Sequence, residues 1–378
     1  MAFLIFIVIL SVLVLIHELG HFIAAKSNGI RVEEFGLGLP PRVLGKKFGE
    51  TIYSLNLLPF GGFVKLTGED FDEEHPEVEK DPRSFISKTP VQRAVVLAAG
   101  VFMNFVLAIG LFYVLLGINN FKTSQIPLFF DYNFKFGTEH IISTLITGMP
   151  ENSPVENLDV NYGDVITRIE GKEVADVEEI KDVLRQNKGK EITLTLRNIR
   201  NYSLDDAETR QVSLTPKIDN KGEPYIGVYI GKSISLSYDK PVQKMFSGFL
   251  HSYNVMAYSI SSLGKIIKTS FITKDMAPVS QSIAGPVGIY QVIKGVLSYK
   301  DANIILTLAD FVALMSLSLA FINLLPIPAV DGGRLIFILI EIIRKKKVSP
   351  VLEAKIHRIG MAFLLGFLIL ITIKDIFI

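Results

Sequence analysis

The 378-residue sequence contains no cysteine, which excludes disulfide bonds, a thiolate nucleophile and any metal site with cysteine ligands. It also has no excess of either charge. The formal net charge is +1, so the chain lacks the basic surplus that neutralises nucleic-acid phosphates. Histidine is scarce as well, with six in the whole chain. Any metal site must therefore be built from histidine, aspartate and glutamate.

Long uncharged runs are what the sequence does contain. Hydrophobic residues make up 49% of the chain, and the mean hydropathy is +0.38. Four runs are apolar enough to span a membrane, with a buried core helix as the alternative for each: residues 2–25, 94–118, 311–330 and 359–373. The first is not expected to be a signal peptide, because it has no basic leader and no clear cleavage site. We therefore predict a multi-pass α-helical membrane protein with four spans.

The basic residues of the loops predict an orientation for these spans. Lysine and arginine are frequent between the first and second spans, and again between the third and fourth. Both of these loops are therefore expected on the cytoplasmic side. The long 119–304 segment and both termini are then expected outside.

The first apolar run ends in ionisable side chains, the sequence HELGH at residues 17–21. His17 and His21 are four residues apart, so on a helix they share one face and can ligate one zinc ion. Glu18 projects beside them, as the general base of a metalloprotease does. The alternative is a pair of hydrogen-bonded core histidines. Charged groups at the centre of a membrane helix each cost about 2.5–3.5 kcal/mol, and metal binding compensates for that cost.

The sequence offers several carboxylates as a third metal ligand. Glu33 and Glu34 follow the motif in the same loop. Another aspartate lies in NLLPIPAVDGG at residues 323–333. Pro326 and Pro328 must break the third span there, and the two glycines let backbone segments approach closely. Broken backbone at membrane depth occurs only where it is buried in protein or lines a wet cavity.

Depth in the membrane distinguishes the two aspartates of the third span. Asp310 lies 21 residues before Asp331, roughly 30 Å along a helix, so the two cannot reach one metal ion. The first and third spans both run from outside to inside, and His17 and His21 lie in the cytoplasmic half of the first. Asp331 lies at the cytoplasmic end of the third span and is therefore the favoured ligand.

Both motifs resemble those of the site-2 protease family of intramembrane zinc metalloproteases, in its bacterial RseP/RasP-like branch. HELGH is similar to the family's HExxH, and NLLPIPAVDG (323–332) to its NxxPxPxLDG, with Val330 where leucine is usual. Three further segments also resemble family segments: LPFGGFVKL (58–66), residues 81–105 with Val101 replacing the usual proline, and GPVGI (285–289). The resemblance covers nearly the whole chain.

This resemblance implies roles for individual residues. The implied zinc ligands and general base are His17, His21, Asp331 and Glu18. Asn323 is implied to lie near the active centre and bind the substrate backbone, with an ordinary helix–helix hydrogen bond as the alternative. Asn104 in the second span is interpreted as an asparagine of that ordinary kind. The other candidate substrate-binding residues are Gly61, Gly62, Pro326 and Pro328.

Residues 51–66, TIYSLNLLPFGGFVKL, predict a membrane-associated β-hairpin with Gly61 and Gly62 at its turn. Peptide bonds in a helix are shielded by their own hydrogen bonds, so a protease inside the membrane must first extend its substrate. A hairpin edge beside the zinc would stabilise an extended substrate by strand addition.

The long outer segment has a different character. Residues 149–198 predict strands at 165–169 and 191–196 around a helix at 176–187. The sequence SPV…GDVITRIEGKEV resembles a PDZ domain of this family, which implies an inserted α+β domain acting as a size filter or substrate sensor. A domain with no ligand of its own is the alternative. Residues 242–268 repeat apolar side chains at helical spacing, as an interfacial amphipathic helix or an ordinary packing helix does.

Four segments follow from these patterns: two spans with a cytoplasmic loop, a PDZ-like domain, an outer connector, and the last two spans. Their bounds are 1–118, 119–235, 236–304 and 305–378. The resemblance implies a Zn²⁺ endopeptidase in the plasma or inner membrane, with its active site towards the cytoplasm. Its implied substrates are single-span membrane proteins such as anti-sigma factors or remnant signal peptides. A non-catalytic membrane PDZ scaffold and a metal-ion transporter are the alternatives.

Overall fold

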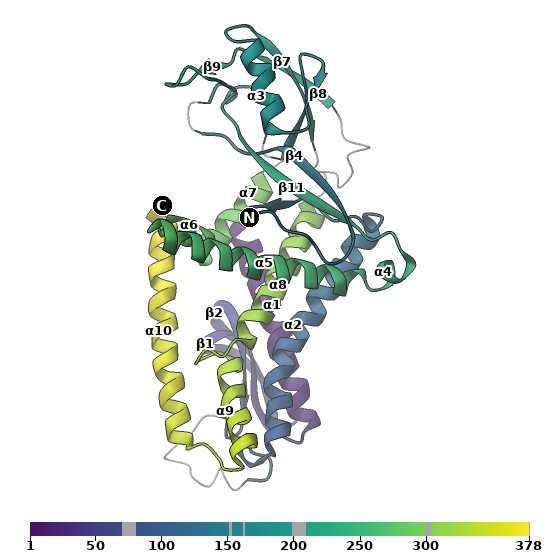
Figure 1. The fold of residues 1–378 in the computed structure, drawn as a ribbon. Coiled ribbons are helices and arrows are strands. Elements are labelled where there is room, and N and C mark those ends of the chain that lie inside the picture. Colours follow the sequence, from purple (N-terminus) through teal and green to yellow (C-terminus); the bar gives the residue numbers. More distant parts are fainter. Residues whose placement is uncertain (70–80, 151–152, 162, 199–208, 299–303, 378) are drawn as a thin grey trace. The chain divides into compact units, whose positions relative to one another are not determined.

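The computed structural model describes residues 1–377 except 70–80, 151–152, 162, 199–208 and 299–303 (Figure 1). The chain divides into two compact units. The first unit comprises Met1–Phe112, Ile266–Lys300 and Ile304–Ile378, and the second comprises Tyr113–Lys265 and Asp301–Asn303.

Four helices are long and apolar enough to cross a membrane: α1 (Ala2–Ser27), α2 (Pro90–Ile118), α8 (Ile304–Leu324) and α10 (Pro350–Phe377). The third differs from its predicted range of 311–330. Helix α8 begins earlier and ends at Leu324, because proline cannot continue a regular helix. After the proline-containing connection, the chain resumes as helix α9 (Asp331–Arg344).

The core of the first unit forms around α1. Helix α7 (Pro286–Ser298) packs on it, and Ile293 lies fully buried against Phe6, Ile9 and Leu13. The other short helices of this unit are η2 (Phe85–Ser87) and α6 (Ala277–Ser282). The opposite end of α1 packs against α2 through a separate apolar cluster that includes Ala25 and Val96.

Two long strands, β1 (Val32–Phe48) and β2 (Thr51–Leu66), form an antiparallel sheet beside α1. The chain reverses between Phe48 and Thr51 and again within residues 51–66, because Leu37 pairs with both Leu55 and Gly62. Gly61, with a φ of +77°, lies in this second reversal, and Gly62 begins the arm that follows it. Each strand doubles back on itself, so that Glu34 pairs with both Ile52 and Lys65, and Ser54 pairs with both Gly36 and Gly45. The sheet thus has two edges, one formed by residues 61–66, here called the β2 end arm, and the other by residues 42–48.

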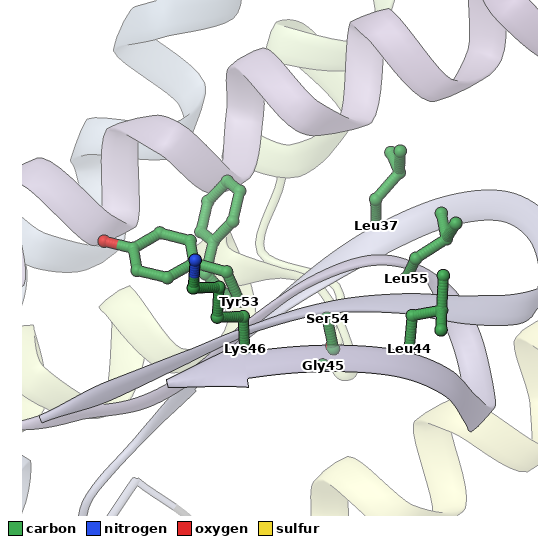
Figure 2. Close-up of a pocket in the computed structure, with 8 residues that line it drawn as sticks. Leu37, Leu44, Gly45, Lys46, Tyr53, Ser54 and Leu55 are labelled. Atoms are coloured by element: carbon green, nitrogen blue, oxygen red, sulfur yellow. The ribbon is translucent and has the colours of Figure 1, made fainter. Parts of the chain in front are cut away.

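An open apolar furrow lies on this sheet, with a volume of about 400 Å³. Figure 2 shows Leu37, Leu44 and Leu55 close together at one end of it, and Tyr53 and Lys46 at the other. Rings from the sheet also contact α1, because Phe22 lies 5.4 Å from Phe35 and 6.1 Å from Tyr53 between ring centroids.

The second unit is built on a sheet with the strand order β3-β11-β4-β5-β7-β8, to which β6 is added beside β5. These strands are β3 (Ile126–Leu128), β4 (Thr138–Gly148), β5 (Asp164–Ile169), β6 (Lys172–Glu173), β7 (Ile192–Asn198), β8 (Thr209–Leu214) and β11 (Tyr229–Ser237). Helix α3 (Val177–Gln186) buries Ile180, Val183 and Leu184 in its core. The strands predicted at 165–169 and 191–196 and the helix predicted at 176–187 agree with β5, β7 and α3 to within two residues. Residues 151, 152 and 162 of the same segment lie outside the described residues. A small pair of strands, β9 (Lys217–Ile218) and β10 (Pro224–Tyr225), completes the unit.

After β11 the chain forms α4 (Pro241–Met245) and α5 (Ser247–Thr273). The helical spacing predicted for 242–268 is present, but the apolar side of α5 faces outward. Its exposed stripe consists of Phe249, Tyr253, Ile260, Leu263 and Ile267, and Phe246 just before the helix is exposed as well. The buried side is polar, and Asn254 donates a 2.7 Å hydrogen bond to the carbonyl of Phe136.

Candidate metal centre

Helix α1 places His17 and His21 on one buried face. The two residues are 7% and 8% exposed, and their Nε2 atoms lie 3.1 Å apart. Their ring planes are nearly perpendicular, with centroids 4.8 Å apart. The four-residue spacing on a continuous helix thus aims both nitrogens at one point.

Asp331, the first residue of α9, completes a group of three ligand atoms. Its Oδ2 lies 3.0 Å from Nε2 of His17 and 3.4 Å from Nε2 of His21. In the described part of the chain, these three residues form the one group of His, Cys, Asp or Glu side chains that could hold a metal ion. Asp310, the rival from the same apolar run, is not part of it.

The donor set fits zinc. A tetrahedral zinc ion with ligands at 2.0–2.1 Å holds neighbouring ligand atoms about 3.3 Å apart, which matches the three separations here. Oδ2 of Asp331 is buried and makes no hydrogen bond to any described residue. A buried carboxylate oxygen without a donor is costly unless a cation lies beside it. Two histidines and one carboxylate are also a common ligand set of catalytic zinc sites, which keep one position open.

The segment before Asp331 is held by close backbone packing. A Cβ atom at Gly332 would collide with the backbone of Leu324 and Leu325. A Cβ atom at Gly333 would lie 3.0 Å from Cα of Pro328. These collisions explain why glycines follow Asp331, as the sequence predicted.

Helix α10 braces the same segment from another side. The backbone N–H of Ala329, whose φ is +83°, donates a 2.9 Å hydrogen bond to Nδ1 of His357. Gly360 lies against Pro328, and a Cβ atom there would lie 2.8 Å from the carbonyl oxygen of Pro328. The position of Asp331 therefore depends on α10 as well as on its own helix.

Helix α2 covers the histidine rings on their far side. Nδ1 of His21 lies 2.9 Å from the carbonyl oxygen of Val96, a hydrogen-bond distance. Gly100 follows one turn later, directly against both rings. No pattern in the sequence points to the carbonyl of Val96. The one signal for Gly100 is the run of small residues AAG, at 98–100, within an otherwise bulky span.

Glu18 lies on the side of α1 that faces the β2 end arm. A Cβ atom at Gly62 would lie 3.8 Å from Cγ of Glu18 and 3.9 Å from Val14. A Cβ atom at Gly61 would also lie 3.9 Å from Val14. The edge of the sheet thus lies beside the candidate base, directly after the reversal of the chain at Gly61.

The two glutamates considered as alternative ligands are engaged elsewhere. Glu34 pairs with Arg42, and Glu33 lies 3.0 Å from Nζ of Lys65. Burial raises the pKa of Glu34, but hydrogen bonds from Ser54 and Arg42 outweigh it and lower the pKa overall. Both carboxylates therefore belong to the sheet.

The remaining predicted site residues lie between α8 and α9. Asn323 is half-buried in the last turn of α8. Pro326 is exposed and Pro328 is half-buried in the connection to Asp331. These three residues thus flank the metal-ligand segment and make none of the contacts within the three-residue group.

The sequence model of peptidase family M50 matches residues 5–367. The chain belongs to peptidase family M50. Zinc metalloprotease RasP of Shouchella clausii is 30% identical over 445 residues, which cover 98% of this chain and 97% of the relative. The regulator of sigma-W protease RasP of Bacillus subtilis is 27% identical over 457 residues, with the same coverage of both chains.

This M50 peptidase is a zinc metalloprotease and a membrane protein. Its cofactor is Zn²⁺, as the sequence predicted. Family membership therefore decides against the transporter and the non-catalytic scaffold. Among solved structures, the PDZ domain of an SdrC-like protein from Listeria innocua is 22% identical, with a TM-score of 0.20. That match covers 23% of this chain and 92% of the PDZ domain.

Proposed function

We propose that this M50 peptidase hydrolyses peptide bonds within the transmembrane segments of single-span membrane proteins. The observation that carries the proposal is the convergence of His17, His21 and Asp331, which come from the ends of two apolar stretches. A zinc site in that position serves substrates that are themselves in the membrane. The name of the Bacillus subtilis relative supports an anti-sigma factor as one substrate class, and remnant signal peptides are another.

His17, His21 and Asp331 hold the zinc ion in this proposal, and Glu18 is the general base. When bound, zinc lowers the pKa of a water molecule towards ~7 and polarises the scissile carbonyl. Glu18 accepts the proton of the attacking water and then delivers it to the leaving amine. Its place on the helical turn of His17 and His21 keeps it beside the reacting atoms.

The β2 end arm presents the substrate in an extended form. Residues 61–66 are an edge of the sheet and pass within van der Waals distance of the helix that carries Glu18. An edge strand has unpaired N–H and C=O groups that can pair with an unwound substrate. Asn323, Pro326 and Pro328 flank the metal-ligand segment, and Asn323 contacts the substrate backbone there.

The proposal also includes four membrane spans. The two loops that are rich in lysine and arginine, one between the first and second spans and one between the third and fourth, lie in the cytoplasm. This orientation places the metal site towards the cytoplasm and the second unit outside. The second unit is a PDZ-like domain that filters or senses substrates. The exposed apolar stripe of α5 supports an interfacial position for that helix.

The variant Glu18→Gln tests the proposal. Glutamine keeps the size of the side chain but cannot accept the proton, so the purified variant should retain zinc and lose cleavage of a single-span membrane reporter. The measurement is reporter cleavage in proteoliposomes, together with the zinc content of each preparation. Undiminished cleavage by the variant would refute the assignment of Glu18, and absence of cleavage by the wild type would refute the substrate class.

A further inference from the structure

Asn104 of α2 lies against the far side of His17. It is 0% exposed, and its Nδ2 atom is 3.3 Å from Nδ1 of His17. Its other amide atom, Oδ1, is buried and makes no hydrogen bond to any residue that the structure describes. A buried amide oxygen without a donor is destabilising by about 1–3 kcal/mol. In this amide orientation the acceptor Oδ1 has no partner, although the Nδ2 atom of the same amide lies beside His17.

The tautomer of His17 explains this arrangement. Nε2 of His17 faces Asp331 and His21, so Nε2 is the atom that faces the metal. A neutral imidazole has one N–H group, and when Nε2 carries the free electron pair the proton lies on Nδ1. Nδ1 then needs an acceptor, and an amide NH₂ group cannot accept. Rotating the Asn104 amide by half a turn places Oδ1 opposite Nδ1, and this rotation exchanges two groups of nearly equal size.

The neighbouring ligand His21 has the same kind of support. Its Nδ1 lies 2.9 Å from a main-chain carbonyl oxygen, that of Val96. Val96, Gly100 and Asn104 are spaced four residues apart, so they form one stripe along α2. Helix α2 thus provides a main-chain acceptor at Val96 for His21 and space at Gly100 for both rings. The Asn104 amide provides a side-chain acceptor for His17.

The backbone of Asn104 is itself anchored. The hydroxyl of Ser316 in α8 donates a 2.8 Å hydrogen bond to the carbonyl oxygen of Asn104, and Ser316 is fully buried. This bond links α2 to α8 without touching His17. It offers a matched control, because its loss perturbs the same residue but leaves the amide and the ring in place.

We propose that Asn104 is the positioning residue of His17. Its amide oxygen accepts the Nδ1–H proton and thereby fixes the tautomer and ring plane in which Nε2 faces the metal. This inference rests on the proposed metal site, and it assigns Asn104 a role beyond the ordinary helix–helix hydrogen bond expected from the sequence. Partners of this kind typically change metal affinity by about 10–100-fold when they are removed.

The test compares Asn104→Leu with Asn104→Asp in the full-length, detergent-purified protein. Both side chains have nearly the shape of asparagine, but only aspartate presents an oxygen acceptor. Zinc affinity is measured by competition with a chromophoric chelator. We expect about 10–100-fold weaker binding for Asn104→Leu. We expect affinity at or above the wild-type value for Asn104→Asp, because a carboxylate accepts the Nδ1–H bond and makes the ring more basic.

Two controls make the outcome decisive. Ser316→Ala should leave zinc affinity within about twofold of wild type, and thermal unfolding of the metal-free proteins should show that all variants are folded. Unchanged affinity of Asn104→Leu would overturn the inference, as would equal losses in the Leu and Asp variants, which would indicate packing alone. If the wild type binds zinc but does not cleave the membrane reporter, the proposed function fails and the inference about Asn104 is still tested.

Discussion

Gly100 lets α2 approach the paired histidines. A Cβ atom at this position would lie 2.8 Å from Nε2 of His17 and closer still to Nε2 of His21. Real Cβ atoms do not come so near to other heavy atoms, so any side chain here must displace one ring or the helix itself. The absence of a side chain at Gly100 is therefore part of the geometry of the metal centre.

Gly100→Ala should consequently weaken zinc binding by about 10–100-fold, the range expected when a ligand is misoriented. Gly110→Ala is the matched control, because it lies on the same helix and a Cβ atom there would meet nothing within 4 Å. Chelator competition on both purified variants provides the measurement. A Gly100→Ala protein that binds zinc as tightly as Gly110→Ala would contradict the argument.

Among single residues, the sequence predicted the candidate metal ligands but not the residues that contact and position them. His17 and His21 could be paired because helical spacing fixes their relation, and the two prolines pointed to Asp331. Gly100 and the carbonyl of Val96 could not be found, because no local pattern tells which face of one apolar helix meets another. Such contacts depend on packing between helices far apart in the sequence.

At the scale of elements, the proposed role of the β2 end arm can be tested with proline substitutions. Proline removes a backbone N–H, and successive residues of a strand direct their N–H groups to opposite sides. Val64→Pro and Lys65→Pro therefore remove one N–H that faces β1 and one that faces away. Loss of the outward group should slow reporter cleavage about tenfold, the worth of roughly one hydrogen bond, and should leave zinc content unchanged.

Each proline variant is compared with alanine at the same position, which separates the loss of the N–H from the loss of the side chain. Val43→Pro, on the other edge of the sheet, should leave cleavage unchanged. If every proline variant that retains zinc cleaves as fast as its alanine counterpart, substrate pairing along this arm is excluded.

Helix α10 offers a second test at the scale of elements. Valine at Gly360 would press on Pro328 and shift the segment that carries Asp331. We expect Gly360→Val to weaken zinc binding by at least tenfold. Gly366→Val lies on the same helix where a Cβ atom meets nothing within 4 Å, and it should leave zinc binding unchanged. Equal affinities of the two variants would show that α10 does not position Asp331.

Residues 51–66 show which part of the sheet could be predicted from the sequence. Adjacent glycines usually mark a turn, and Gly61 and Gly62 were interpreted in that way. In the structure the chain doubles back before Gly62, Gly61 has a φ of +77°, and a Cβ atom at Gly62 would lie 2.8 Å from the carbonyl oxygen of Gly36. The sequence did not identify residues 32–37 as the partner of both arms, because pairing with another segment is a contact between residues distant along the chain.

At the scale of the whole molecule, a buried histidine links the stability of the second unit to pH. In the second unit, burial lowers the pKa of His251 from 6.5 to about 4. Between these values the unfolded chain binds a proton that the folded chain does not bind. Stability therefore falls as the pH falls from about 6.5 to about 4, by roughly 1.4 kcal/mol per pH unit.

Hydrogen exchange of the β11 and α5 amides in the full-length protein measures this effect. The amides should lose protection as the pH falls through that window, and His251→Leu should flatten the dependence even if its stability at neutral pH is lower. Because a chelator is present in both samples, zinc release does not contribute to the difference. Parallel slopes in the two proteins would show that His251 is protonated in the folded state.

The general organisation was accessible from the sequence because hydropathy and residue spacing report it directly. The four apolar helices and the strands and helix of residues 164–198 agree with those expectations. For residues 242–268 the sequence left an interfacial helix and an ordinary packing helix open, since amphipathic spacing does not reveal which side packs inward. Hydrogen bonds such as that from Asn254 to Phe136 fix the polar side inward.

The candidate ligands enter the growing polypeptide at very different times. A ribosome makes His17 and His21 about 310 residues before it makes Asp331. In the proposed site, the two histidines therefore lack their carboxylate partner while the intervening residues are made. A translation product that stops before Asp331 carries two of the three proposed metal ligands and lacks the third.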